Sequence, residues 1–576
     1  MLVGLTALVQ GACRNKFVLK GSVIAALGGL TMKLGLAFTI LVFSSTTILA
    51  QQSDMQMKSA EKPVELLSGL GSWHHATSTK NADAQSFFDQ AFRMIYGFNH
   101  EEAVRSFKRA AELDPGMAMA WWGVAIALGP NINLDVDPDR ERAAYEAVQK
   151  ALSLAKNAPA NERDYIAALA KRYAHDPKAD LKKLAVDYKN AMGELVKKYP
   201  DDLDAATLYA ESAMDLHPWQ LWSAEGKPAE GTEEIVAVLE SVLKRNPDHP
   251  GAIHYYIHAV EASPHPERAL AYAPKLPRLM PMAGHLVHMP AHIYERVGDY
   301  SSAAKSNLDA AAADESYFKA TGVHGVYSMY YVHNLDFLAI ANGMQGRYRD
   351  AIESSNKLIE FTRPMIKDMP MFEPVLAKSL LMWERFHRWD EIMKQPEPDA
   401  SLPSTLAVWH FARGMAFAWR GEIANAEAER QAFQKAEKAV PVNSMSSLNP
   451  TPKLLLIAEE VLGARIAEAL HDNKTALELL SKGLSDEDSL AYDEPPQWFH
   501  PVREILGGFL LRRGKAAEAE KVFRADLERN RHSGRSLFGL IESLKAQNKT
   551  SDAAVVQKEF AAAWKNADTK LSAAEF

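Results

Sequence analysis

The stretch GFNHEEAVRSFKRAAELDP, residues 97–115, shows how this chain folds. Its apolar residues Ala103, Phe107 and Ala110 are three or four positions apart, so in a helix they lie on one face. Pro115 follows, and proline cannot continue a helix because it has no amide hydrogen to donate. Trp121 then opens the next apolar segment. The pattern predicts an amphipathic helix that ends near Pro115 and packs on the helix that follows.

Related segments recur along the chain from about residue 80, at a spacing of roughly 34 residues. The turn between two helices is repeated in GDYSSAA (298–304), GRYRDAI (346–352) and GEIANAE (421–427), and RRGKAAEAEKVFRADLERN (512–530) continues the pattern. In these segments the sequence resembles the tetratricopeptide repeat (TPR) superfamily. The resemblance covers roughly residues 80–565.

That resemblance implies an all-α fold, a right-handed superhelix of about eleven or twelve stacked helix-turn-helix repeats. The pattern weakens at 130–160, 218–232 and 435–450, where insertions are expected. Within the superfamily, the chain is most similar to large exported bacterial-type proteins with a histidine-rich central region. This similarity implies an architecture but no particular activity.

The composition of the chain excludes some classes of function. The chain has 576 residues, of which 47% are hydrophobic and 24% charged, and its net charge is −8. A nucleic-acid partner is therefore not expected, because such proteins present a basic face. The single cysteine, Cys13, permits neither a disulfide framework nor a thiolate metal site. Polar residues 51–79 are expected to form a flexible leader, and 566–576 a C-terminal tail.

The N-terminal residues 1–50 have the pattern of a targeting segment. KLGLAFTILVFSSTTILA (33–50) places a lysine before an apolar run, which predicts a signal peptide cleaved after Ala50. Met32 is its natural start. We therefore expect a periplasmic or secreted protein. The alternative is a membrane anchor formed by residues 34–50, and no other segment is apolar enough to span a membrane.

Histidines cluster in three consecutive repeat units, GAIHYYIHAVE (251–261), GHLVHMPAHIYER (284–296) and VHNLDF (332–337). At helical spacing, the histidines of the second segment form a stripe about 80° wide, away from the packing face. Two pairs have the i, i+4 spacing with which imidazoles chelate one ion. The predicted metal ligands are His254, His258, His285, His288 and His292. Glu261 and Glu295 are candidate catalytic bases or groups that orient the imidazoles.

The cofactor predicted from these residues is a divalent transition metal. Imidazoles with carboxylates suit zinc, iron, manganese or nickel, whereas the nearby Met280, Met282, Met289 and Met329 would suit copper. Methionine at helical spacing also fills cores. The sequence contains neither HEXXH nor a phosphate-binding glycine loop.

Other residues are expected to line the concave groove that consecutive first helices form in the superfamily. These groove residues are Glu211, His217, Trp219, Tyr330, His333 and Asp336. The loops 129–139 and 493–501 are long enough to close over the groove. Pro290 lies inside a first helix, where it frees the carbonyl of Leu286 and interrupts the helix.

Two functions remain open from the sequence. The groove binds a peptide, a protein segment or a small molecule, as superhelical concave surfaces commonly do. Alternatively, the histidine cluster of residues 254–333 forms a metal-dependent site (Zn, Fe, Mn or Cu), with or without catalysis. Fold alone does not choose between them, because function belongs to sites on folds.

Overall fold

A computed structural model describes residues 63–322, 325–572 and 575–576. The predicted signal segment, the start at Met32 and the first part of the leader lie outside the described residues. The described chain is all-α except for a hairpin of two-residue strands, β1 (Met445–Ser446) and β2 (Asn449–Pro450). The predicted fold class, stacked helix pairs without a central sheet, is confirmed.

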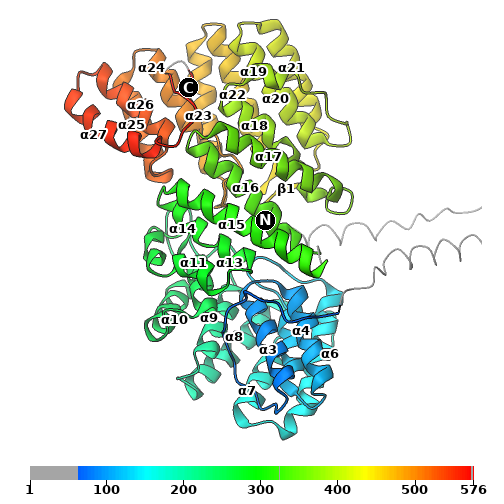
Figure 1. Ribbon diagram of the computed structural model, residues 1–576. Helices are drawn as coiled ribbons and strands as arrows, with labels where there is room; N and C mark the ends of the chain where they lie inside the picture. The colour runs from blue at the N-terminus through cyan, green and yellow to red at the C-terminus, as the bar shows by residue number, and fades with distance from the viewer. Residues whose placement is uncertain (1–62, 323–324, 573–574) are drawn as a thin grey trace, which may run out of the picture.

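The helices follow one another in the order of the sequence, with α3 to α11 in the lower half of Figure 1 and α17 to α27 in the upper half. The first group is α3 (Ala82–Tyr96), α4 (His100–Leu113), α5 (Ala118–Leu128), α6 (Pro138–Leu154), α7 (Ala160–Leu169), α8 (Leu181–Lys198), α9 (Leu203–Met214), α10 (Thr232–Arg245) and α11 (Pro250–Val260). The middle group is α12 (Leu276–Leu279), α13 (Gly284–His288), α14 (Pro290–Arg296), α15 (Tyr300–Thr321), α16 (Ser328–Met344), α17 (Tyr348–Thr362) and α18 (Lys378–Arg385). The last group is α19 (Trp389–Met393), α20 (Pro403–Trp419), α21 (Ile423–Glu437), α22 (Thr451–Ala469), α23 (Asn473–Asp488), α24 (Val502–Arg512), α25 (Ala516–Arg529), α26 (Gly534–Ala546) and α27 (Thr550–Ala563).

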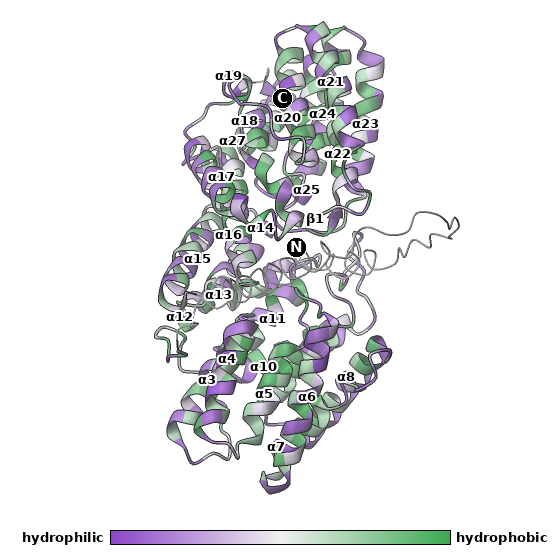
Figure 2. Ribbon diagram, turned by 90° about the vertical axis from the view of Figure 1, so that its right-hand side faces the viewer, coloured by the Kyte–Doolittle hydropathy of each residue, from purple (hydrophilic) through white to green (hydrophobic). Residues whose placement is uncertain are grey.

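Most of these helices pack against their neighbours in the sequence because each is apolar on one face. In Figure 2 hydrophobic and hydrophilic residues alternate along the ribbons of the outer helices. Helix α5 is apolar on nearly all sides, since α4, α6 and α7 surround it. The turns contain the predicted glycines: Gly298, Gly346 and Gly421 have φ of 80°, 73° and 74°. Such left-handed positions favour glycine, which has no Cβ.

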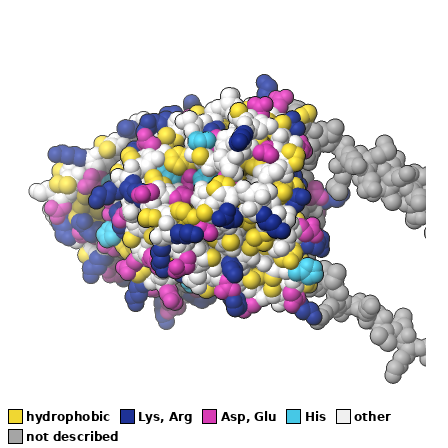
Figure 3. Space-filling view, turned by 90° about the horizontal axis from the view of Figure 1, so that it is seen from below, with side chains coloured by type: hydrophobic (Ala, Val, Ile, Leu, Met, Phe, Trp, Pro, Cys, Tyr) yellow, Lys and Arg dark blue, Asp and Glu magenta, His cyan; other side chains and the backbone are white. Residues whose placement is uncertain are grey.

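The buried apolar residues form two large clusters, one extending to Phe372 and the other beginning at Ala377. Smaller clusters around α15 and α16 lie between them. On the face drawn in Figure 3, basic and acidic side chains are interspersed. Among the described helices, none combines the length and the apolar character needed to cross a membrane.

One segment differs from what the sequence predicts. Residues 63–79, expected to belong to a flexible leader, are held against the helices. Trp73 Nε1 donates to Asp204 Oδ1 at 3.1 Å, and His75 Nδ1 lies 2.7 Å from Asp204 Oδ2. In the expected tail, Asp568 accepts the amide of Tyr348 at 2.7 Å, and Phe576 is buried. Leu70 of the first segment and Phe576 of the tail each belong to one of the two large apolar clusters.

Candidate metal centre

Six histidines from four helices meet at one buried place in the middle of the stack. Helix α11 carries two of them, α13 two, and α14 and α16 one each. Five of these residues are at most 3% exposed. The six are His254, His258, His285, His288, His292 and His333. The sequence predicts these histidines on an open groove face, but the structure buries them.

A break in one helix lies between His288 and His292. Helix α13 ends at His288 and α14 begins at Pro290, which has no amide hydrogen. The interruption predicted at Pro290 is thus present, between the two histidines. Their Nε2 atoms are 2.8 Å apart.

The first group of ligands, the 288 triad, consists of His288, His292 and His333. The Nε2 atom of His333 is 3.2 Å from that of His288, so three ring nitrogens converge. In two of the three rings, the nitrogen that does not point into the triad contacts a residue outside it. His288 Nδ1 lies 2.7 Å from Asn307 Oδ1, and His292 Nδ1 lies 2.7 Å from Glu261 and 2.9 Å from Glu494. Such contacts fix the ring orientation that a metal ligand needs.

The second group, the 254 triad, consists of His254, His258 and His285. His254 Nδ1 donates to the carbonyl of Tyr96 at 2.7 Å, and a carbonyl only accepts, so the Nε2 of a neutral His254 carries a lone pair. That Nε2 is 3.1 Å from His285 Nε2. His258 Nδ1 lies 2.7 Å from Glu261, while its buried Nε2 has no hydrogen-bond partner.

Burial and the neighbouring groups set the protonation of these rings. Burial, with the repulsion of nearby imidazoles, lowers the pKa of His254, His285, His288 and His333, so they are neutral at pH 7. Burial alone would also lower the pKa of His292, but the charges of Glu261 and Glu494 and hydrogen bonds to them raise it to about 10. Neutral imidazole is the form that binds metal.

A cavity of about 30 Å³ lies between the two triads. Its wall includes two histidines of each triad, His258 and His285 from one and His292 and His333 from the other. Three loops close it and contribute Asn133, Trp219 and Glu494; Tyr330 and Met329 of α16 complete it. The Trp219 ring stands edge-on to the His258 ring, with 5.6 Å between the ring centroids. The backbone of Trp219 is left-handed, with a φ of 60°.

The other residues predicted to line the groove lie in different places. Tyr330 packs against His285 at 4.2 Å between ring centroids. Asp336 pairs with Lys378 at 2.7 Å, outside the triads. His217 lines a separate cavity of about 990 Å³. Glu211 is buried beside Asp215, and burial with this neighbour raises the pKa of Glu211.

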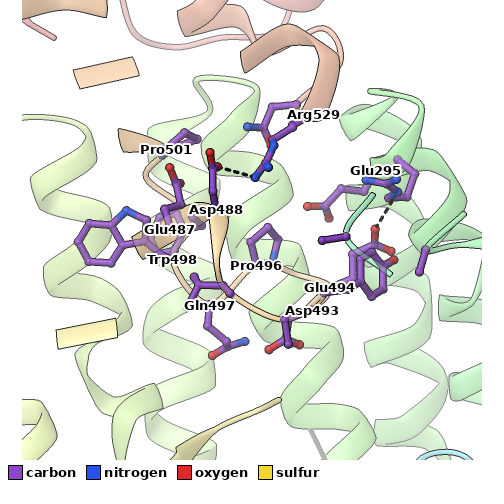
Figure 4. A pocket seen from close by; sticks show the side chains of 18 of the residues that line it. Glu295, Glu487, Asp488, Asp493, Glu494, Pro496, Gln497, Trp498, Pro501 and Arg529 are labelled. Carbon is purple, nitrogen blue, oxygen red and sulfur yellow. Dashed lines mark ion pairs between the residues drawn. The ribbon is translucent and has the colours of Figure 1, made fainter. Parts of the chain in front are cut away.

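Glu295 lies on the wall of a third cavity, of about 320 Å³, which also reaches Asp493 and Glu494. Figure 4 shows Glu295 and Glu494 on one side of it and the ion pair of Asp488 with Arg529, 2.8 Å long, on the other. Burial and the charge of Glu494 raise the pKa of Glu295. Of the two predicted catalytic carboxylates, only Glu261 contacts the triads in the described structure.

Several contacts of the centre were not predicted. Glu494 belongs to the loop 493–501, which the sequence marks as a closing segment, but its bond to His292 links residues 202 positions apart. Asn307 lies on the second helix of its repeat, and the groove pattern, which concerns the first helices, does not predict its contact. The carbonyl of Tyr96 belongs to the backbone, so the residue type does not predict its contact with His254.

Comparisons with known proteins add little to this description. No family model and no curated protein matches the chain. Among solved structures, human IFIT1 with m7Gppp-AAAA is 14% identical over 84% of this chain and 91% of its own, with a TM-score of 0.33. The P58(IPK) TPR domain is 11% identical over 81% and 99%, with a TM-score of 0.23. Yeast Tom70 is 12% identical over 83% and 97%, with a TM-score of 0.27.

These TM-scores are too low to support an inference about ligands. The repeat class rests on the chain itself, whose consecutive helix pairs and left-handed glycine turns are TPR-like, as the sequence predicts.

Proposed function

We propose that the protein is a metalloprotein that binds a divalent transition-metal ion through the 288 triad. The convergence of three Nε2 atoms carries the proposal. Tetrahedral zinc at 2.0–2.1 Å from each nitrogen would separate the nitrogens by about 3.3 Å. The separations of 2.8 Å (His288 to His292) and 3.2 Å (His288 to His333) would need to open by about 0.5 and about 0.1 Å to reach this geometry.

The charges around the triad also suit a cation. Glu261 and Glu494 are 1% and 6% exposed, and both contact the same ring nitrogen of His292. Buried carboxylates are costly unless they are paired with positive charge. A protonated His292 supplies that charge when no ion is bound, and a divalent ion that displaces this proton would supply it through the imidazole.

The triad leaves one coordination position for a further ligand. Structural zinc sites have four protein ligands, whereas sites with three keep a position for water or substrate. The cavity beside His292 and His333 gives that position space. This arrangement favours ligand binding or catalysis at the ion over a purely structural role.

Replacing His333 with alanine should abolish stoichiometric binding to the 288 triad while leaving the protein folded. His333 is the least buried of the six, and its polar contact in the described structure is with His288. Zinc content after dialysis should fall below that of the wild type, as measured by plasma mass spectrometry. The control is His410→Ala, since His410 is a partly buried histidine of α20 paired with Glu429. Equal zinc in wild type and His333→Ala would contradict the proposal.

Peptide binding, the other function expected from the sequence, has a separate candidate location. The cavity of about 990 Å³ near α8 and α9 is lined by Leu181 and Val186, which are 45% and 41% exposed. Exposed apolar side chains on a concave wall favour an apolar peptide segment.

A displayed random-peptide library should yield binders to the wild type that the double variant Leu181→Asp, Val186→Asp does not retain. The matched control is Leu308→Asp, because Leu308 is 58% exposed but lies outside this cavity. Binders retained equally by both variants would contradict this location.

A further inference from the structure

We infer that the centre holds two metal ions side by side, one on each triad, with a small ligand shared between them. The inference rests on the proposed function for the 288 triad and adds a second ion, its neighbour and the class of ligand. The 254 triad, like the first, consists of three histidines whose candidate ligand atoms lie within 4.8 Å of one another, and all three of its histidines are buried.

The hydrogen bonds of the 254 triad leave its lone pairs facing inward. The Nδ1 atoms of His254 and His258 are engaged by the Tyr96 carbonyl and by Glu261. The Nε2 atom of His258 is buried without a partner. An unsatisfied buried nitrogen is costly, and a cation between the three rings would satisfy it. His285 Nδ1 is also unpartnered, so this ring is held mainly by packing between Phe98 and Tyr330.

The two triads are adjacent rather than separate. The rings of His258 and His292 have centroids 6.0 Å apart, and so do those of His285 and His288. One carboxylate joins the groups, because Glu261 contacts His258 with Oε1 and His292 with Oε2, each at 2.7 Å. Ions held on the two triads would therefore be neighbours in one enclosure.

The enclosure determines the kind of ligand that both ions can share. Two histidines of each triad line the cavity, so the remaining coordination positions of both ions face it. A buried water needs roughly 10–15 Å³ of such space, and the cavity has about 30 Å³. It fits water, hydroxide or a two-atom molecule. Trp219 and Tyr330 close it to larger organic molecules.

Copper(II) is the probe that tests the pair most directly. It has the highest affinity among the common divalent ions for nitrogen ligands, and each ion carries one unpaired electron. Two ions sharing a ligand couple their spins, so the electron paramagnetic resonance signal falls below the copper content. Wild type loaded with copper(II) should hold two ions per chain, one for each triad, and show far less than two spins.

The variant that separates the two ions is His285→Gln. His285 makes few polar contacts, so its replacement should disturb the fold least. This variant should hold one copper ion per chain with one full spin, whereas the control His410→Ala should behave as wild type. If far-ultraviolet circular dichroism shows that His285→Gln is unfolded, His258→Gln tests the same triad.

The outcomes separate this inference from the proposed function. No copper in the wild type overturns both. One copper ion, lost in His333→Ala and kept in His285→Gln, supports the proposed function and overturns the second ion. Two ions with two full spins in the wild type show independent sites, which overturns the shared ligand.

Discussion

Replacing Glu261 with glutamine is expected to weaken metal binding by about 10- to 100-fold, the usual effect of removing a group that orients a ligand. Glu261 is 1% exposed, and its two oxygens contact Nδ1 of His258 and Nδ1 of His292. Burial would raise the pKa of this carboxyl, but the two histidines lower it, so it is ionised. The carboxamide of glutamine has only one oxygen that accepts hydrogen bonds, so it cannot accept from both rings. The substitution also removes a negative charge beside the rings.

The affinity is measured by competition with a chromophoric chelator for zinc or copper. The matched control is Glu267→Gln, six positions further along the chain, because Glu267 is partly exposed and contacts His265 outside the centre. Unchanged affinity in Glu261→Gln would show that the carboxylate balances charge in the fold without supporting the imidazoles.

Replacing Glu504 with glutamine should destabilise the fold by about 3–5 kcal/mol, the range found when one partner of a buried ion pair is removed. Glu504 of α24 is 0% exposed. It accepts from Arg535 at 2.9 Å and Arg385 at 3.3 Å, which come from α26 and α18. Both guanidinium groups are also buried. The variant would leave two buried positive charges without their carboxylate.

The loss should be measured by urea unfolding at pH 7 and compared with Glu518→Gln, whose partly exposed pair with Lys515 should matter by less than about 1 kcal/mol. Burial would raise the pKa of Glu504, but the two arginines lower it. Its stabilising effect is therefore present above the ordinary pKa of glutamate, about 4.3, and is lost as the pH falls below it. The difference in the free energy of unfolding between wild type and Glu504→Gln should become smaller as the pH is lowered. A difference in the free energy of unfolding below about 1 kcal/mol at pH 7 would contradict a stabilising role of this buried ion pair.

The fold and the members of the histidine cluster follow from local patterns, because repeat units are defined by short-range spacing. Apolar spacing and turn glycines locate the helices, and the i, i+4 histidine pairs mark the faces that meet. The burial of the cluster does not follow from them. Helical periodicity tells which side chains share a face, but the loops that contribute Asn133, Trp219 and Glu494 cover that face. Their positions depend on contacts far apart in the chain.

The difference between local pattern and tertiary position also explains why only one of the two predicted catalytic carboxylates lies at the centre. Glu261 and Glu295 occupy the same position in consecutive repeats, yet only Glu261 meets the triads. The second repeat is interrupted before Pro290, whereas α11 runs unbroken from Pro250 to Val260, so equal positions in the two repeats need not be equivalent in space. Sequence periodicity assumes that equivalence.

The bond between His292 and Glu494 has a further consequence, since it joins α14, in the middle group of helices, to the loop between α23 and α24 in the last group. Occupation of the centre and attachment of the C-terminal helices are then linked equilibria: whatever favours one favours the other. An ion present at 100 times its dissociation constant stabilises the state that binds it by about 2.7 kcal/mol. Metal supply would thus contribute to how firmly the middle and last groups of helices hold together.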